Sequence, residues 1–98
     1  MLFTVTCTDK PGALQVRMNN RPAHLEHAAQ LKAVISGGPL FTDNGETFIG
    51  SFFIMEAESR QAVEDLMAQD PYVKAGLFES IVIRRFKQVL PDSKPFRG

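Results

Sequence analysis

"PLFTDNGETFIGSFFIMEA", residues 39–57, contains two apolar runs with a turn between them. Asn44 and Gly45 form the dipeptide that is favoured in tight hairpins. We therefore predict a short strand over residues 39–42 and a long strand over residues 47–57 that returns beside it.

The long strand is apolar on both of its sides. Alternation places Phe48, Phe52 and Ile54 on one side and Ile49, Phe53 and Met55 on the other. A strand with two apolar sides is covered on both, and burial of one phenylalanine side chain is worth about 1.5–3 kcal/mol. Helices can cover one face of the sheet. For the other face we predict a second copy of the chain, packed face to face in a symmetric homodimer.

The segment before the hairpin begins with another strand. "LFTVTCT", residues 2–8, alternates between apolar residues and threonines, which is typical of a half-buried strand. Cys7 lies on its apolar side and is predicted to be a packed residue without reactive chemistry. A turn at residues 9–12 follows, and after it an irregular or short helical segment that holds Arg17.

A helix is predicted next, over residues 21–35. Asn20 is suited to cap it, Pro22 lies near its start, and "SGG" at residues 36–38 would end it. On this helix His24 falls on the apolar stripe, which it shares with Ala28, Leu31 and Ile35.

The segment after the hairpin predicts a second helix and a last strand. Ser59 can cap a helix over residues 60–69, and this helix ends before Pro71 because proline cannot continue it. A capped turn that ends at Gly76 and a strand over residues 79–89 complete the pattern. The order β-α-β-β-α-β indicates a ferredoxin-like α+β fold, an antiparallel four-stranded sheet with two helices on one face. We expect one domain over residues 1–90 and a loosely held tail over residues 91–98.

Composition limits the classes of partner. Eleven Lys and Arg balance eleven Asp and Glu, so no overall charge would attract nucleic acid or a membrane surface, and we expect neither as a partner. A single cysteine and the absence of a signal-like or membrane-spanning stretch make the cytoplasm the expected location. His24 and His27 have an H-x-x-H spacing, but a zinc site needs three or four ligands, so we predict neither a metal nor a cofactor. The basic run "RRFK" is typical of a solvated edge strand, and no glycine-rich phosphate loop is present.

The residue pattern leaves two interpretations of His24. It can be a core histidine that bonds to a backbone carbonyl. It can also pair with a carboxylate, for which Asp70 is the best candidate. Asp70 in turn can cap the next helical turn or reach the histidine.

Several segments together resemble the YciI-like, or YCII-related, proteins of bacteria. They are "RPAHLEH" after an upstream Arg17, "GGPL", the Gly50-Ser51 pair, "DPYVKAGLFES" and "VIRRF". The resemblance extends to about Leu90. It implies a ferredoxin-like fold, dimerisation as a dimeric α/β barrel, and a candidate active site on a His-Asp pair. Matched to this sequence, the pair is His24 and Asp70.

Such a pair can carry out acid/base chemistry. An imidazole takes up or releases a proton near neutral pH, and a carboxylate on one ring nitrogen fixes its tautomer. Ser51 is predicted to bind substrate, since nothing in the sequence places it beside His24 as a nucleophile. Arg17 and Arg21 could hold an anionic substrate or be solvated charges, and Gly38, Pro39 and Tyr72 could line the same pocket or be turn and packing residues.

Three functions fit this reasoning. The first is a small dimeric enzyme of lyase, isomerase or hydrolase type that uses the His24–Asp70 dyad on a small, possibly anionic, organic metabolite. The second is a non-catalytic module that binds or senses a small molecule in the same cleft. The third is a structural dimerisation domain in which His24 is a core residue. Fold alone does not choose among them.

Overall fold

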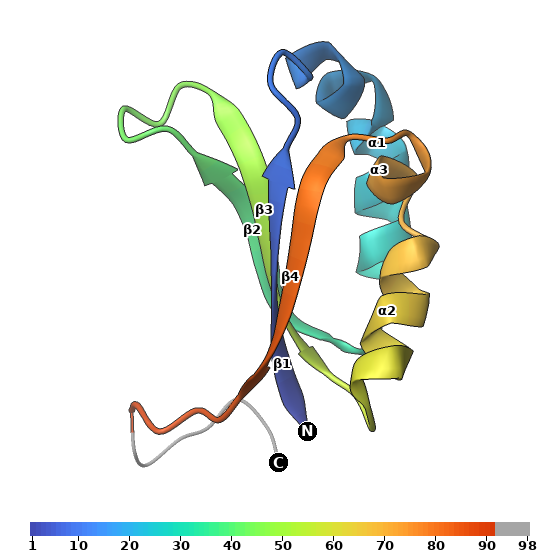
Figure 1. The fold of residues 1–98 in the computed structure, drawn as a ribbon, viewed down its shortest axis with the longest axis vertical. Helices are drawn as coiled ribbons and strands as arrows, with labels where there is room; N and C mark the ends of the chain where they lie inside the picture. The colour runs from blue at the N-terminus through green and yellow to red at the C-terminus, as the bar shows by residue number, and fades with distance from the viewer. Residues whose placement is uncertain (92–98) are drawn as a thin grey trace.

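A computed structural model describes residues 1–91 of the chain. It contains a four-stranded antiparallel sheet in the order β2-β3-β1-β4, and the helices lie on one face of it (Figure 1). The ferredoxin-like α+β prediction is therefore confirmed. The strands are β1 (Leu2–Asp9), β2 (Val34–Phe41), β3 (Phe48–Glu56) and β4 (Phe78–Phe86), and the helices are α1 (Leu14–Ala29), α2 (Arg60–Ala68) and α3 (Pro71–Lys74).

The core lies between the sheet and the helices. On β1 the apolar residues Phe3, Val5 and Cys7 are buried on the helix side, as the alternation predicts. They pack with Phe53 and Met55 of β3. Val63, Met67 and Ile83 complete the buried cluster. Burial, the largest effect, raises the pKa of the Cys7 thiol to about 12, so this cysteine is a packed residue, in agreement with the prediction.

Helix α1 differs from its prediction at both ends. It begins at Leu14, so Asn20 and Pro22 lie inside it, and the Asn20 side chain donates to the Val16 carbonyl instead of capping. Residues 14–20 contain good helix formers, and Pro22 is exposed, where its ring is tolerated. The helix ends at Ala29 because residues 34–41 pair with β3.

The strand that replaces the predicted end of α1 is β2. It includes Val34 and Ile35, whose branched side chains favour a strand, and residues 36–38, which were expected to terminate the helix. Between the paired residues of β2 and β3 the register shifts near the hairpin: β2 advances one residue, from Leu40 to Phe41, while β3 moves from Gly50 to Phe48.

This irregularity is a bulge at Ile49, and it reverses the direction of Phe48. Alternation predicts Phe48 on the same side of the strand as Phe52, and in the structure Phe53, on the other side, is the one that faces the helices. The Phe48 ring instead contacts two arginines of α1, and Ile49 is 45% exposed. The prediction for Phe48 is wrong because one extra residue in a strand exchanges the faces of the residues beyond it.

The second half of the chain follows its prediction closely. The Ser59 hydroxyl accepts a hydrogen bond from the Ala62 amide and caps α2, and Asp70 caps α3. Gly76, with φ of 71°, ends this turn in a conformation that favours glycine. Strand β4 ends at Phe86, three residues before the predicted end. Within residues 1–91 no helix has the length and hydropathy needed to cross a membrane. The predicted tail, from residue 92 on, lies outside the described residues.

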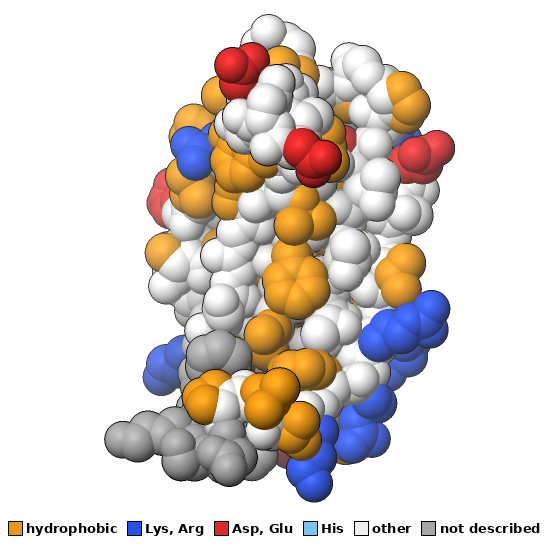
Figure 2. Space-filling model, turned by 90° about the vertical axis from the view of Figure 1, so that its left-hand side faces the viewer, with side chains coloured by type: hydrophobic (Ala, Val, Ile, Leu, Met, Phe, Trp, Pro, Cys, Tyr) orange, Lys and Arg blue, Asp and Glu red, His pale blue; other side chains and the backbone are white. Residues whose placement is uncertain are grey.

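Within residues 1–91, no helix lies against the face of the sheet opposite α1 and α2 (Figure 1). Cross-strand rows on it pair Thr6 with Phe52 and Val82, and Thr4 with Ile54. Hydrophobic side chains form a stripe down the middle of this face, with polar surface beside it (Figure 2). Val82 is 40% exposed, so an apolar surface of the sheet is open in the single chain.

Candidate active site

His24 and Asp70 meet between α1 and the start of α3. The Nδ1 atom of His24 lies 3.1 Å from Oδ1 and 3.0 Å from Oδ2 of Asp70, and both side chains are buried. The pairing comes from two elements far apart in sequence. Of the two interpretations of His24, the structure agrees with the one in which it has a carboxylate partner.

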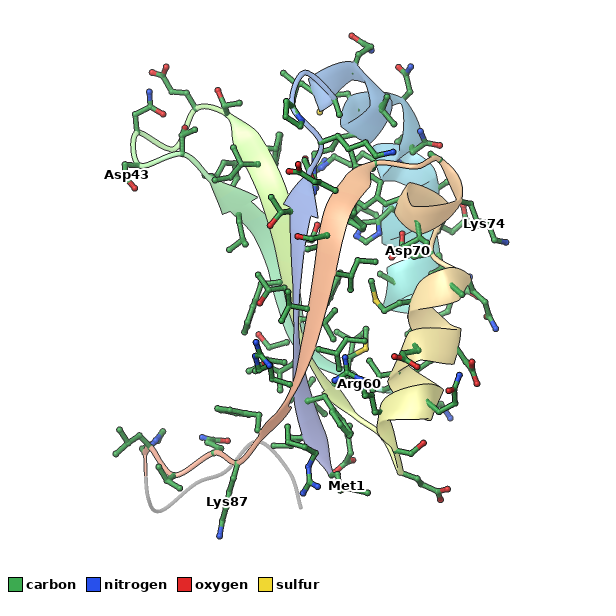
Figure 3. The ribbon with its side chains drawn as sticks, viewed as in Figure 1. Met1, Asp43, Arg60, Asp70, Lys74 and Lys87 are labelled. Carbon is green, nitrogen blue, oxygen red and sulfur yellow. The ribbon has the colours of Figure 1, made fainter. Side chains whose placement is uncertain are left out.

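The position of Asp70 follows from the start of α3. Residues before proline avoid helical backbone angles, and Asp70 accordingly has an extended backbone, with φ of −66° and ψ of 130°. Its Oδ1 accepts a hydrogen bond of 2.8 Å from the Tyr72 amide. Figure 3 labels Asp70 where the chain passes from α2 into α3. The carboxylate is thus both the cap of α3 and the partner of His24.

Tyr72 holds the plane of the imidazole. Its ring stacks on that of His24 with centroids 4.0 Å apart and an angle of 16° between the planes. Phe53 contacts His24 from the sheet, with ring centroids 6.1 Å apart. Tyr72 is fully buried, and burial raises the pKa of its hydroxyl, although the nearby Arg17 and Arg21 oppose this. The histidine is therefore fixed by a hydrogen bond at its edge and a ring on its face.

Apart from the contacts of Nδ1 with Asp70, no hydrogen bond of His24 occurs within residues 1–91, so its second ring nitrogen has no protein partner there. His24 lines a cavity of about 110 Å³. When Nδ1 carries the proton and donates it to the Asp70 carboxylate, Nε2 carries a lone pair that can accept a proton. The arrangement can therefore move a proton to or from a molecule in the cavity.

All six predicted substrate-binding residues line this cavity together with His24: Arg17, Arg21, Gly38, Pro39, Ser51 and Tyr72. Asp70 does not line it and lies behind His24. The apolar part of the cavity wall was not predicted. It consists of Leu25, Ala28, Val34, Gly37 and Phe53. Phe53 was assigned only to an apolar side of its strand, and Val34 lay within the predicted helix, because a periodic pattern does not distinguish a core side chain from a cavity wall.

Arg17 is the most enclosed charge in the site, with 2% of its surface exposed. Its Nε and Nη2 atoms donate to the two carboxylate oxygens of Asp9 at 2.8 and 2.9 Å, and Nη2 also donates to the Ser51 hydroxyl at 2.9 Å. Its guanidinium lies 4.7 Å from the Tyr72 ring centroid. Burial disfavours the charge, but the interactions with Asp9 and Tyr72 together outweigh burial and raise the pKa of Arg17.

Asp9 is a site residue that the sequence reasoning assigned only to a turn. It lies at the end of β1, where the register of the β1–β4 pair shifts. Asp9 ends a buried strand and lies eight residues before Arg17. This spacing indicates an ion pair only when the segment between the two residues is known to be helical. The charge of Arg17 is consequently compensated inside the protein.

Arg21 differs from Arg17 in this respect. Its guanidinium lies 5.6 Å from the Phe48 ring centroid, and no carboxylate within residues 1–91 forms an ion pair with it. It lines the cavity and is half-buried. A positive charge without a partner at the cavity wall can attract an anionic group of a ligand. No group of three His, Cys, Asp or Glu side chains suited to a metal ion occurs in the described part of the chain.

Known proteins are similar to this chain over most of its length. The model of the YCII-related domain matches residues 1–87. Protein YciI of Escherichia coli is 35% identical over 97 residues, which cover 91% of this chain and 99% of that protein. A 5-chloro-2-hydroxyhydroquinone dehydrochlorinase from Burkholderia phenoliruptrix, solved in complex with 2,5-dihydroxybenzoquinone, is 42% identical with a TM-score of 0.81 and covers 89% of this chain and 94% of its own.

A more distant structure shares the fold alone. SnoaB, a cofactor-independent oxygenase from Streptomyces nogalater, is 13% identical with a TM-score of 0.56, and covers 93% of this chain and 96% of its own.

Proposed function

The chain belongs to the family of YCII-related domains, and we propose that it is an enzyme in which His24 transfers protons to and from a small hydroxylated ring compound. The observation that carries this proposal is the histidine itself. Nδ1 of His24 is held by Asp70, the residue lines a cavity, and Nε2 has no hydrogen-bond partner within residues 1–91. A core histidine would need no such carboxylate.

The roles follow from the contacts. His24 acts as general base and, once protonated, as general acid, while Asp70 keeps its reactive nitrogen directed at the substrate. The Ser51 hydroxyl accepts a hydrogen bond from Arg17, so its own hydrogen is free to donate to the substrate. Arg17 is a positioning residue because its charge is engaged by Asp9. Arg21 supplies the positive charge that faces a substrate oxygen.

The cavity supports a single ring as substrate. Its volume of about 110 Å³ is somewhat below the roughly 150 Å³ of an engineered apolar cavity that binds benzene, and it is partly open. The walls include the apolar side chains of Phe53, Leu25 and Val34. One uncompensated arginine suits one ionised oxygen, such as that of a phenolate or an enolate. The dehydrochlorinase at 42% identity was solved with a ring compound of this kind.

The proposed reaction is proton exchange at such a ring. A hydroxyl becomes a carbonyl when its proton leaves for His24 and the electron pair moves into the ring. The ring then takes a proton at carbon, which is an isomerisation. When that carbon also carries a leaving group, a second hydroxyl loses its proton and becomes a carbonyl, and the electron pair moves through the ring as the leaving group departs with its bonding pair. With chlorine as the leaving group, the substrate loses a proton to His24 and a chloride ion to solvent. No oxidant or reductant is consumed.

The test measures turnover. We expect the protein to release chloride from 5-chloro-2-hydroxyhydroquinone and to lose this activity in His24→Ala. His27→Ala changes the other histidine of α1, which does not line the cavity, and is the matched control, with folding checked by circular dichroism. If the protein binds 2,5-dihydroxybenzoquinone but converts neither this ring nor chlorinated or hydroxylated analogues, the non-catalytic binding module is the correct function.

The proposal also includes a homodimer. Thr4, Thr6, Phe52, Ile54 and Val82 lie on the open face of the sheet. Contiguous apolar surface of this kind is unfavourable in water, and a second sheet would cover it in a symmetric way. This assembly leaves the His24 cavity on the opposite, helix-bearing side of the sheet.

A further inference from the structure

The Arg17–Asp9 ion pair lies at the boundary of two cavities. Arg17 lines the cavity of His24, which has a volume of about 110 Å³. Asp9 lines a second cavity of about 380 Å³ between the loop after β1 and the β2–β3 hairpin. The wall of the second cavity is largely apolar and includes Pro11, Ala13, Leu14, Leu40, Phe48 and Ile49. The His24 cavity therefore has a larger neighbour on the far side of one ion pair.

Phe48 stands at this boundary. It lines the second cavity, and its ring centroid lies 5.7 Å from the guanidinium carbon of Arg17 and 5.6 Å from that of Arg21, both of which line the first. The bulge at Ile49 is the cause of this position, since regular alternation would direct Phe48 to the open face of the sheet. Bulges of this kind often redirect a side chain near a functional site.

The ring of Phe48 is supported from the hairpin. Phe41 of β2 packs against it with centroids 4.8 Å apart and an angle of 34° between the planes. Phe41 itself is 43% exposed and lines neither cavity. The hairpin projects from the sheet away from the helices, with Asp43 near its tip (Figure 3). The two arginines and Phe41 thus hold the ring of Phe48 in place.

We propose that Phe48 is the specificity-determining residue of this site, because its ring separates the two cavities and restricts the substrate to a single ring. This inference rests on the proposed function for the role of the His24 cavity as the substrate site. Removing the ring joins the two spaces, so that a second fused ring can extend past the ion pair toward Leu40. The apolar wall of the second cavity suits an unsubstituted ring better than a charged group.

The experiment compares two probes in matched variants. Dissociation constants of 2,5-dihydroxybenzoquinone and of the bicyclic 2-hydroxy-1,4-naphthoquinone are measured by calorimetry for the native protein, Phe48→Ala, Phe48→Leu and Phe41→Ala. We expect the native protein to prefer the monocyclic probe, and Phe48→Ala to shift the ratio of the two constants by about tenfold or more toward the bicyclic one. Phe48→Leu, which keeps an apolar side chain if alanine impairs folding, shifts it in the same direction. Phe41→Ala keeps the Phe48 ring and its contacts with Arg17 and Arg21, so the ratio should stay near its native value.

A crystal structure of Phe48→Ala separates failure of this inference from failure of the proposed function. One continuous cavity from Ser51 to Leu40 together with the shifted ratio supports the inference. Unchanged selectivity in a protein that binds the monocyclic probe overturns it and leaves the proposed function intact. If no variant binds either probe, the proposed substrate class is wrong. In that case the crystal structure still tests the role of Phe48. A hairpin that collapses into the vacated space, so that the two cavities stay separate, contradicts the inference.

Discussion

Asp70 has two partners, and one conservative substitution separates their contributions. Asparagine caps helices about as well as aspartate, so in Asp70→Asn the Tyr72 amide keeps its acceptor and the stability of the fold changes little. The side-chain amide can now donate to Nδ1 of His24, which moves the ring proton to Nε2. We expect turnover to fall by about 10²–10⁴-fold, and ¹⁵N NMR of the histidine to show the exchanged tautomer.

The double variant His24→Ala/Asp70→Asn provides the control. Residues that act as one catalytic unit are strongly non-additive, so its activity should equal that of His24→Ala within error. Independent, multiplying losses would show that Asp70 acts on the reaction by another route, and an unchanged tautomer in Asp70→Asn would contradict its orienting role.

Cys7 gives a second prediction, for stability at high pH. An unburied thiol ionises near 9.0, whereas burial raises the pKa of Cys7 to about 12. Below pH 9 the thiol is protonated in both states and adds no pH dependence. Between these values the unfolded chain releases the proton and the folded chain keeps it, so folding stability falls as pH rises.

The measurement is urea unfolding of the native protein and of Cys7→Ala at two pH values. From about pH 8 to about pH 10 the native protein should lose about 1.4 kcal/mol more than the variant. Comparison of the two removes the contribution of Tyr72, which is the same in both. Equal losses, or rapid alkylation of the native thiol at pH 8, would contradict a packed Cys7.

Single site residues could be predicted from the sequence where a local pattern or the family resemblance pointed to them. His24 was singled out because an imidazole on an apolar stripe is unusual. Asp70 was singled out because it precedes Pro71 at a helix start, and the family resemblance pairs it with that histidine. Asp9 was missed because its importance depends on a contact with Arg17, and sequence spacing reveals such a contact only when the path of the chain between them is known.

Among the elements, α1 shows where propensity and tertiary structure compete. Pro22 and Asn20 are typical start signals, yet the helix begins at Leu14 and extends through both. As a result, Arg17 and His24 lie on one helix, and Arg17 forms a buried ion pair with Asp9. At the other end, pairing of β2 with β3 prevails over the glycines that suggested a helix end.

Strand pairing also makes one glycine of β3 essential. A Cβ atom at Gly50 would overlap the backbone oxygen of Cys7 on the adjacent strand, whereas one at Gly38 would have no neighbour within 4 Å. Gly50→Ala should therefore cost about 1–3 kcal/mol or more through overpacking against backbone that cannot move aside. Gly38→Ala is the matched control and should change stability little.

Thermal and urea unfolding of the two glycine variants measure this difference. A Gly50→Ala protein as stable as the native one would mean that β1 and β3 separate easily at this point. That result would also weaken the assignment of the bulge at Ile49, since the bulge starts beside this close contact.

For the whole molecule, the order of elements and the two-sided apolar character of β3 were enough to predict the architecture. The bulge was not predicted, because regular alternation contains no signal for one extra residue in a strand. The direction of the Phe48 side chain depends on the bulge and was therefore predicted wrongly. Phe52 and Phe53 were correctly placed on opposite faces, and the structure shows that Phe53 is the one in the core.

Phe52 therefore becomes the test of the homodimer. A charge at the centre of the open face would be buried without a partner in the assembly, so Phe52→Asp should convert a dimer into monomers or aggregates. Gln15→Asp adds the same charge on the exposed first turn of α1, where it is favourable, and should leave the dimer intact. Light scattering of dilute samples measures the mass. A native protein that is a stable monomer would sink the prediction.

The double role of Asp70 has a consequence for protein design. The orientation of its carboxylate is set by the backbone of an Asp-Pro helix start, with a hydrogen bond to the next amide but one. An Asp-Pro-Tyr start docked against a helix that carries a histidine is therefore a transplantable unit. Three residues on one fragment and one on another supply an oriented imidazole, and any scaffold that brings two helices together in this way can receive it.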